Sequence, residues 1–302
     1  MARREVVRLP VAGQMRDHVS YSELRLFEQC EWKWYLVKAL GLGADERSLP
    51  MEFGSAIHST LEKAFSPDAT PSQEELDLEF RSAYEKNVEG LELQPHEVEE
   101  RERLRELGPK IVRDALACPD LQGIRPMKNE LALMVPIART DGLDVKFKGF
   151  VDFVYAKRLK TKTVIYIADF KTCTWGWPAA KLMDPKVCAQ ILLYKHFFCK
   201  ITGANPRDVS AAFILLRKTP REGDSSVSVE KIGAGPKVLQ SALDFLQGTI
   251  TGMHSGEYRK NRESCVRRWV DPVTKEDREA RCPFFETTEC PSADVPGVST
   301  PR

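Results

Sequence analysis

The segment VIYIADFKT, Val164–Thr172, constrains the fold of this chain more than any other feature. It begins as an apolar run rich in β-branched and aromatic residues, which is typical of a buried strand. The run ends on Asp169 and Lys171, and because these residues are two apart, their side chains leave the same face of the strand. The segment therefore predicts a sheet protein in which a buried strand delivers a carboxylate and an ammonium to one place.

The hydrophobic patterns along the rest of the chain predict an α/β protein. Three successive strand-like segments occupy the middle of the chain, and the last two are joined by KRLKTK and should form a hairpin. Helices are predicted over residues 21–39, 51–65, 73–87, 96–118, 185–199 and 236–254, and strands over 130–138, 145–156, 163–172 and 209–217. This order indicates an α/β core with a helical cap, and the last dozen residues are expected to be disordered.

The charges of the chain nearly balance. Its 302 residues carry 45 Lys and Arg against 44 Asp and Glu, so no overall field attracts a polyanion, and nucleic-acid binding has to come from local patches. The N-terminus lacks the apolar core of a signal peptide, and no run approaches the length of a membrane span. We therefore expect a cytoplasmic protein without membrane contact, whose eight cysteines are buried thiols or metal ligands rather than disulfides.

Asp152 and Asp169 are predicted to approach each other across the hairpin. With the loop centred near residues 159–160, Asp152 lies opposite Ile167 or Ala168, and in the first register Asp169 is its diagonal neighbour on the same face. Two adjacent carboxylates repel each other, and a hard divalent cation such as Mg²⁺ or Mn²⁺, which prefers oxygen ligands, relieves that repulsion. The alternative interpretation is a surface Asp–Lys salt bridge at a strand end, which is common.

Phe170 and Lys171 give this interpretation its chemistry. The backbone carbonyl of Phe170 can supply a further oxygen ligand. Beside a metal ion, Lys171 can position or polarise a water molecule, or neutralise charge that grows on a phosphate. The pattern therefore predicts a site for attack on a phosphodiester.

Four short motifs occur in a fixed order around this strand. They are His58 in GSAIH, Asp152 in GFVD, Asp169 and Lys171 in DFK, and Gln190 and Tyr194 in QILLY. The order of these motifs makes the chain, from about Tyr21 to Cys290, resemble the PD-(D/E)XK nuclease superfamily. It is specifically similar to the RecB-like exonucleases and the CRISPR-associated adaptation nucleases related to them. Individually, a helical histidine or a Gln-x-x-x-Tyr pair is more often a packing feature, so the order carries the resemblance.

The resemblance implies a role for each residue. His58, Asp152 and Asp169 would be metal ligands with the Phe170 carbonyl, and Lys171 would be the catalytic lysine. Gln190 and Tyr194 would contact DNA or orient Lys171, and Glu130 would be a further helper in the site. Residues 20–290 would form one nuclease domain, preceded by an extension over 1–19 and followed by a tail over 291–302. Within that domain the helical part would cover 20–125, the catalytic core with its mixed central sheet flanked by helices 126–256, and a cysteine-bearing segment 257–290.

The same resemblance implies a [4Fe–4S] cluster with one cysteine before the core and three after it. The matching residues are Cys30, Cys265, Cys282 and Cys290. The spacing departs from the family's pattern, because VRRWVDPVTKEDREAR separates Cys265 from Cys282. That segment is either a loop inserted between ligands or a sign of a degenerate cluster, with zinc or no metal as alternatives. The other four, Cys118, Cys173, Cys188 and Cys199, are expected to be ordinary buried or partly buried thiols.

Local features suggest where DNA would bind. The basic segment Tyr258–Arg268 is the better candidate for a phosphate track, and KRLKTK is expected to be a solvated turn. Trp175 and Trp177 follow the DFK strand and either stack unpaired bases or pack beneath the next loop.

Together these features predict a metal-dependent DNA exonuclease acting on single-stranded ends. The alternatives are an endonuclease or fragment trimmer in a larger complex, and a non-catalytic DNA-binding iron–sulfur subunit. A separate helicase, recombination or CRISPR-adaptation partner fits the resemblance. The processes that use this scaffold include DNA repair, recombination, phage genome processing and CRISPR spacer acquisition.

Overall fold

The computed structural model describes residues 6–8, 17–43, 47–68, 70–140, 143–270 and 277–290. The chain divides into two compact units. The larger unit comprises Glu46–Val135 and Lys148–Leu243, and the smaller unit comprises Met1–Asp45, Pro136–Phe147 and Asp244–Arg302. The expectation of disorder over 291–302 falls outside the described residues.

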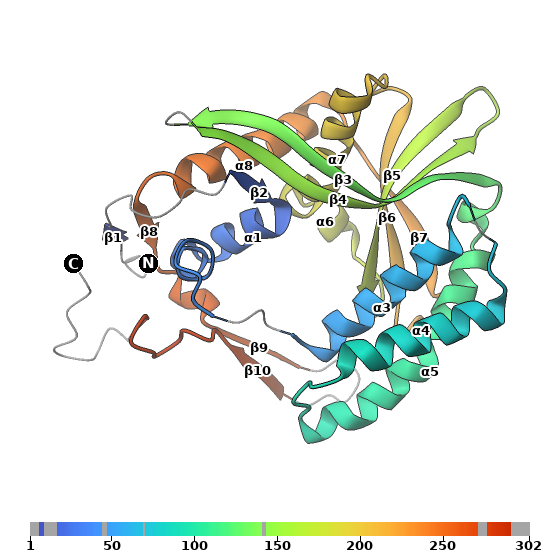
Figure 1. The fold of residues 1–302 in the computed structure, drawn as a ribbon, viewed down its shortest axis with the longest axis horizontal. Coiled ribbons are helices and arrows are strands. Elements are labelled where there is room, and N and C mark those ends of the chain that lie inside the picture. Colours follow the sequence, from blue (N-terminus) through green and yellow to red (C-terminus); the bar gives the residue numbers. More distant parts are fainter. Residues whose placement is uncertain are drawn as a thin grey trace. The chain divides into compact units, whose positions relative to one another are not determined.

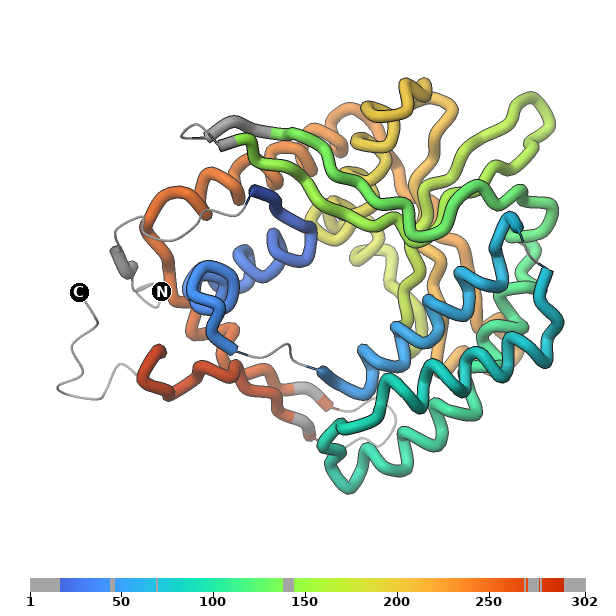
Figure 2. The backbone as a smooth tube through the Cα atoms, in the orientation of Figure 1, coloured from blue at the N-terminus to red at the C-terminus, as the bar shows by residue number. Residues whose placement is uncertain are grey.

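A mixed sheet forms the centre of the larger unit (Figure 1). Strands β4 (Leu143–Arg158) and β5 (Thr163–Cys173) pair as an antiparallel hairpin, and β6 (Val209–Arg217) runs parallel to β5. The outer strand β7 (Val227–Ile232), which the sequence patterns did not predict, pairs antiparallel with β6, and β3 (Ile124–Thr140) pairs with β4. The smooth trace in Figure 2 shows β3 and β4 following each other closely.

Helices cover the sheet and confirm the predicted α/β class. Helices α3 (Leu49–Ala64), α4 (Gln73–Val88) and α5 (Pro95–Ala117) pack together and against one sheet face. Alternate residues of β5, including Tyr166 and Phe170, join their core, so the residues between them face the other side. Helix α7 (Pro185–Thr202) packs on β5 and β6 and links these two parallel strands.

Local signals explain where α7 begins and ends. Asp184 caps its first turn by accepting a hydrogen bond from the Lys186 N–H at 2.8 Å, and Pro185 occupies a position whose missing N–H costs nothing. Gly203 ends the helix in a left-handed conformation, with a φ of 72°. Short 3₁₀ and α turns, η2 (Pro119–Leu121) and α6 (Ala179–Leu182), complete the larger unit.

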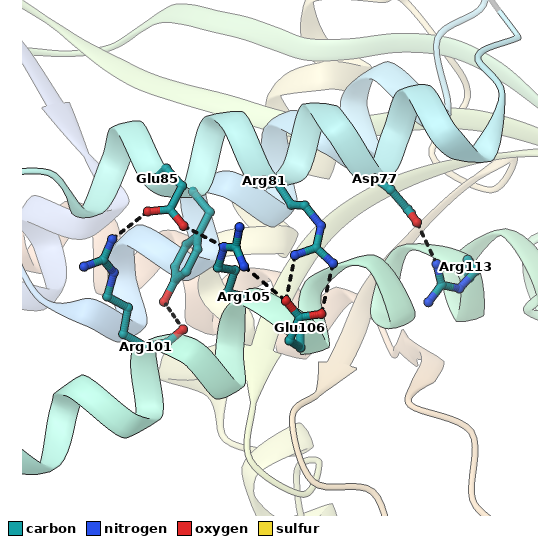
Figure 3. A network of polar contacts seen from close by, with 8 residues as sticks. Asp77, Arg81, Glu85, Arg101, Arg105, Glu106 and Arg113 are labelled. Carbon is teal, nitrogen blue, oxygen red and sulfur yellow. Dashed lines mark hydrogen bonds and ion pairs between the residues drawn. The ribbon is translucent and has the colours of Figure 1, made fainter.

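Charged side chains join the outer faces of α4 and α5 (Figure 3). Arg81 makes a two-pronged pair with Glu106 at 2.7 and 3.0 Å, and Arg105 contacts both Glu106 and Glu85. The inner faces pack closely, because a Cβ on Gly108 would lie 2.0 Å from the ring of Phe80. Two helices that the sequence marked as strongly charged are thus held by apolar packing inside and by an ion-pair network outside.

The smaller unit contains the start and the end of the chain. The predicted helix 21–39 is wrong as one helix, because it consists of α1 (Tyr21–Gln29), α2 (Glu31–Trp34) and the π-helical turn η1 (Tyr35–Ala39). The break falls at Cys30, whose backbone is extended (φ −160°, ψ 108°). The other elements are β1 (Val6–Arg8), β2 (His18–Ser20), most of α8 (Pro236–Met253), β8 (Glu257–Arg259), η3 (Arg262–Ser264), β9 (Val266–Val270) and β10 (Asp277–Arg281).

Pairing in this unit joins distant segments. Strand β1 pairs with β8 and β9 pairs with β10, both antiparallel, and β2 lies on β4. Among the described helices, none combines the length and apolar character that crossing a bilayer requires.

Candidate active site

The hairpin of β4 and β5 opens at the site. Backbone pairing runs from Arg158 opposite Thr163 to Phe153 opposite Ala168, and the turn is closed by the Leu159 N–H donating to the Lys162 carbonyl at 2.8 Å. The predicted register, with Asp152 opposite Ile167 or Ala168, is wrong by one or two residues, because the turn is centred later than assumed. Continuing the observed register would place Asp152 next to Asp169, where the paired ladder has ended.

Asp152 occupies the opening between the strands. Its Oδ2 accepts a hydrogen bond from the Phe170 N–H at 2.8 Å, and His58 Nδ1 lies 3.4 Å from the same oxygen. Burial raises the pKa of Asp152 well above its usual range, and the nearby negative charge of Asp169 raises it further. Asp152 is therefore a carboxylate whose charged form needs a cation.

Asp169 is the most buried charged group of the site. Its side chain is 2% exposed, and Lys171 Nζ lies 2.7 Å from its Oδ2. Apart from this ion pair, that oxygen has no hydrogen-bond partner among the described residues. The opposite charges of the DFK strand thus meet as predicted, and one buried carboxylate oxygen keeps an unused lone pair.

His58 reaches the same place from α3. Its ring lies edge-on to Phe170, with ring centroids 5.8 Å apart, and donates a hydrogen bond to the Phe170 backbone. Burial lowers the pKa of His58, opposed by the charge of Asp169 and by that hydrogen bond. A neutral imidazole, which is the form that binds metal ions, is therefore favoured here.

Glu62 is a site residue that the sequence interpretation missed. It follows His58 by one helical turn on α3, and this i, i+4 spacing was the signal available in the sequence. Burial and the neighbouring charge of Glu130 raise the pKa of Glu62 to about 7, and Glu62 in turn raises the pKa of Asp152. Glu130 lies on β3 with a φ of 45°, a left-handed conformation that is strained for this residue type.

Gln190 and Tyr194 come from the facing helix α7. Gln190 Nε2 donates to the Tyr194 hydroxyl at 3.3 Å, as expected for an i, i+4 pair. Burial raises the pKa of Tyr194 to about 12, and the charges of Asp169 and Asp152 contribute. The tyrosine hydroxyl also takes a hydrogen bond from the backbone of Phe150. The sequence-predicted residues of the four motifs thus converge at the open end of the β4–β5 hairpin.

The oxygen and nitrogen atoms of this site are of the kinds that a hard divalent cation can bind. Among the described residues, no three His, Cys, Asp or Glu side chains have their ligand atoms already arranged as a metal site. The site nonetheless holds two repelling carboxylates, a histidine whose neutral form is favoured and a buried Asp169 oxygen without a hydrogen bond. His58, Asp152, Asp169 and the Phe170 carbonyl are the groups that would hold Mg²⁺ or Mn²⁺.

The four predicted cluster cysteines lie in the smaller unit. Of the residues between Cys265 and Cys282, those that the structure describes form the antiparallel strands β9 and β10, and beside them the Cys282 N–H donates to the Cys265 carbonyl at 2.7 Å. The Asn261 N–H donates to Cys30 Sγ at 3.5 Å, and Cys265 Sγ contacts the Asn261 carbonyl at 3.7 Å. Burial, followed by the nearby thiols of Cys290, Cys282 and Cys30, raises the pKa of Cys265 to about 11. The other three thiols thus lie within electrostatic range of Cys265, but among the described residues no three cysteines are already arranged as a metal site.

The remaining candidates divide into buried and exposed groups. Trp177 packs edge-on against Phe213 with centroids 5.0 Å apart, whereas Trp175 is 54% exposed. In the basic segment Tyr258–Arg268, Tyr258 and Lys260 are buried, so the segment is not a continuous exposed track. The other four cysteines, Cys118, Cys173, Cys188 and Cys199, are buried or partly buried, as predicted.

The structure places carboxylates and a lysine at the open end of a hairpin in a mixed sheet, which is the arrangement expected from the sequence for a metal-dependent nuclease. The sequence matches the family model of the PD-(D/E)XK nuclease superfamily over residues 18–270. The chain belongs to this superfamily, and the membership supports a metal-dependent nuclease activity. A comparison with curated proteins finds no match.

Proposed function

We propose that this chain is a metal-dependent DNA exonuclease of the RecB-like branch that hydrolyses phosphodiester bonds from single-stranded ends. The observation that carries the proposal is the meeting of His58, Asp152, Asp169 and Lys171 at one strand opening. The exposed Trp175 beyond the DFK strand supports a single-stranded substrate, since bases in a duplex are already stacked.

Each residue has a defined task in this proposal. A divalent cation held by His58, Asp152 and Asp169 would supply an activated water and charge stabilisation at the phosphate. Lys171, whose side chain is 30% exposed, holds its ammonium beside buried Asp169 and can neutralise charge that develops on a phosphate oxygen. Gln190 donates to the hydroxyl of Tyr194, one turn further along α7, and this pair would contact DNA or orient Lys171.

The experiment is digestion of 5′- and 3′-end-labelled oligonucleotides, single- and double-stranded, in Mg²⁺, Mn²⁺ or EDTA. Wild-type protein is expected to cut only with metal and to release short products from one end, whose label gives the polarity. Lys171→Ala is expected to lose this cleavage. Lys162→Ala is the matched control, because Lys162 is also ion-paired, at 2.9 Å to Asp208, but lies at the hairpin turn.

The products separate this proposal from its alternatives. Internal cuts in circular single-stranded DNA would replace it with an endonuclease or a trimmer of DNA fragments. Binding without cleavage in either metal would favour a DNA-binding subunit of a larger complex with a helicase, recombination or CRISPR-adaptation partner. Cleavage that Lys171→Ala leaves unchanged would contradict the assigned site.

The proposal includes a [4Fe–4S] cluster on Cys30, Cys265, Cys282 and Cys290, with zinc as the alternative metal. It is supported by the four thiols of the smaller unit lying within electrostatic range of one another. Protein purified without air should be brown, with broad absorption near about 400 nm. Cys265→Ser should lose the colour, whereas Cys199→Ser should keep it. Colourless wild-type protein without iron would contradict the cluster, and zinc analysis would then test the alternative.

A further inference from the structure

Two large aromatic side chains are exposed among the described residues, Phe150 and Trp175. Both flank the candidate active site. Trp175 follows Lys171 by four residues, and Phe150 precedes Asp152 by two residues on β4. Single exposed apolar residues are common on protein surfaces. Phe150 lies within β4 and Trp175 lies just beyond the end of β5, so both are close in sequence to the strand residues that carry the site.

Phe150 shares the site face of β4. Residues two apart on a strand point to the same side, so Phe150 lies on the side of Asp152. The flanking residues Gly149 and Val151 are buried, and Phe153 belongs to the core under α3, α4 and α5. Phe150 is 49% exposed. The strand therefore presents one apolar surface to solvent directly beside a proposed metal ligand.

The backbone of Phe150 is tied to the site residues of α7. Its N–H hydrogen-bonds the Tyr194 hydroxyl, which Gln190 holds from one helical turn away. This contact adds to the pairing of β4 with its neighbouring strands, which holds the backbone at Phe150. The ring is consequently presented on a rigid strand rather than on a loop, which is what a stacking platform requires.

A cation accompanies the ring. Lys148, two residues earlier on the same face of β4, places its Nζ 5.8 Å from the centre of the Phe150 ring. An apolar ring beside an ammonium matches the two parts of a nucleotide, because the base offers a flat face and the phosphate a negative charge. The ring of Trp177, by contrast, already packs against Phe213 and Lys181. The Nζ of Lys181 lies 4.0 Å from the centre of the Trp177 ring.

We propose that Phe150 is the stacking platform for an unpaired base next to the scissile phosphate, and that Lys148 binds a phosphate of the same strand. The inference rests on the proposed nuclease function and deepens it. Stacking on Phe150 is available only to a base that has left its partner. The residue therefore selects single-stranded over double-stranded nucleic acid at this site.

The test measures binding without turnover. The dissociation constants of a fluorescein-labelled single strand and of a hairpin duplex are determined by anisotropy in EDTA, for wild type, Phe150→Ala, Phe150→Leu and Phe150→Trp. Loss of one stacked base is worth about 1–3 kcal/mol, so Phe150→Ala should weaken single-strand binding by about 5- to 150-fold. Phe150→Leu should fall close to Phe150→Ala, and Phe150→Trp should bind like wild type. Duplex binding should change less than about twofold.

A single abasic nucleotide moved along the strand identifies the stacked base. At one position the abasic strand should bind wild type as weakly as the intact strand binds Phe150→Ala, and the two changes together should add no further loss. Leu78→Ala is the control, because Leu78 is 68% exposed on α4 and has no proposed part in the site. Equal binding by wild type and Phe150→Ala, or wild-type binding by Phe150→Leu, would overturn the proposal.

The outcome is separable from the fate of the nuclease proposal. If wild type never cuts DNA but Phe150→Ala still loses single-strand binding selectively, the platform stands and the nuclease function fails. If wild type cuts DNA with metal and Phe150→Ala binds and cuts like wild type, the nuclease function stands and the platform fails.

Discussion

The carboxylate of Asp152 serves as the hydrogen-bond partner of the Phe170 backbone N–H, at 2.8 Å, just beyond the last paired residues of β4 and β5. In an uninterrupted hairpin, a backbone carbonyl of β4 would take that place. Replacement of a backbone carbonyl by the Asp152 carboxylate has two consequences. The strands separate where the site lies, and the carboxylate that separates them is held inside the opening.

The first prediction concerns the two functions of Asp152. Asp152→Asn keeps an oxygen for the Phe170 N–H but removes a charge that burial disfavours, so in EDTA it should be as stable as wild type or more stable. Asp152→Ala leaves the buried N–H without a partner and should cost about 1–3 kcal/mol of unfolding free energy. Urea unfolding of both variants measures this difference. Both should lose metal-dependent cleavage, and an Asn variant less stable than the Ala variant would contradict this assignment.

The second prediction concerns the ion pair of Asp169 and Lys171. Lys171→Met removes the cation next to a carboxylate whose side chain is only 2% exposed, so it should destabilise the fold by about 1–3 kcal/mol. Adding Asp169→Asn should recover most of this loss, because the unpaired charge is then gone. Thermal unfolding of the single and double variants measures the recovery. Cleavage should stay absent in both variants, and additive destabilisation in the double variant would exclude this charge coupling.

The third prediction concerns Glu62, whose pKa of about 7 lies above the usual carboxyl value of 4.5. Between these values the folded protein binds more protons than the unfolded chain, so its stability falls as the pH rises through this window. Glu62→Gln should reduce this fall, leaving the part that Asp152 contributes, and stabilise the protein at pH 8 by about 1–2 kcal/mol, allowing for partial exposure. Unfolding free energies at pH 5 and 8 in EDTA measure the effect. The same fall in both proteins would rule out Glu62 as its source.

The sequence predicted most of this site because its signals are local. The DFK strand, the GFVD strand and the QILLY helix each place their polar residues by simple periodicity, and strand Val209–Arg217 was predicted with its observed bounds. Glu62 was available from the same periodicity, one turn after His58. Glu62 belongs to none of the four motifs, and the neighbouring charge of Glu130 on β3, distant in sequence, becomes visible only in the folded chain.

The features of the fold and the site that the sequence did not predict depend on contacts between residues distant in sequence. The hairpin register is set by where the turn closes, and a shift of one residue changes which side chains meet. The helix predicted as continuous is interrupted at Cys30, which has an extended backbone. The Cys30 thiol accepts a hydrogen bond from the Lys33 N–H at 3.4 Å. The β9–β10 hairpin, which brings Cys265 and Cys282 together, pairs residues that carry no apolar alternation. No local pattern reveals these features.

The fourth prediction concerns the surface network of α4 and α5 in Figure 3. Glu106 pairs with Arg81 and Arg105, yet its side chain is 63% exposed, so water and salt screen these pairs. Glu106→Gln should therefore lower the melting temperature only slightly, and the difference from wild type should shrink in 1 M NaCl. The melting temperature in low and high salt measures it. A larger difference that persists in high salt would mean that the network is part of the core that positions His58.

The central claim is that the carboxylates of β4 and β5 hold the divalent cation on which phosphodiester cleavage depends. The most direct test is single-turnover cleavage of a labelled single strand over a range of Mn²⁺ concentrations, by wild type and by Asp169→Asn. Wild-type cleavage should be absent in EDTA and rise to saturation with Mn²⁺, and Asp169→Asn, folded by circular dichroism, should not cleave at any concentration. Cleavage by Asp169→Asn with the Mn²⁺ dependence of wild type would contradict the claim.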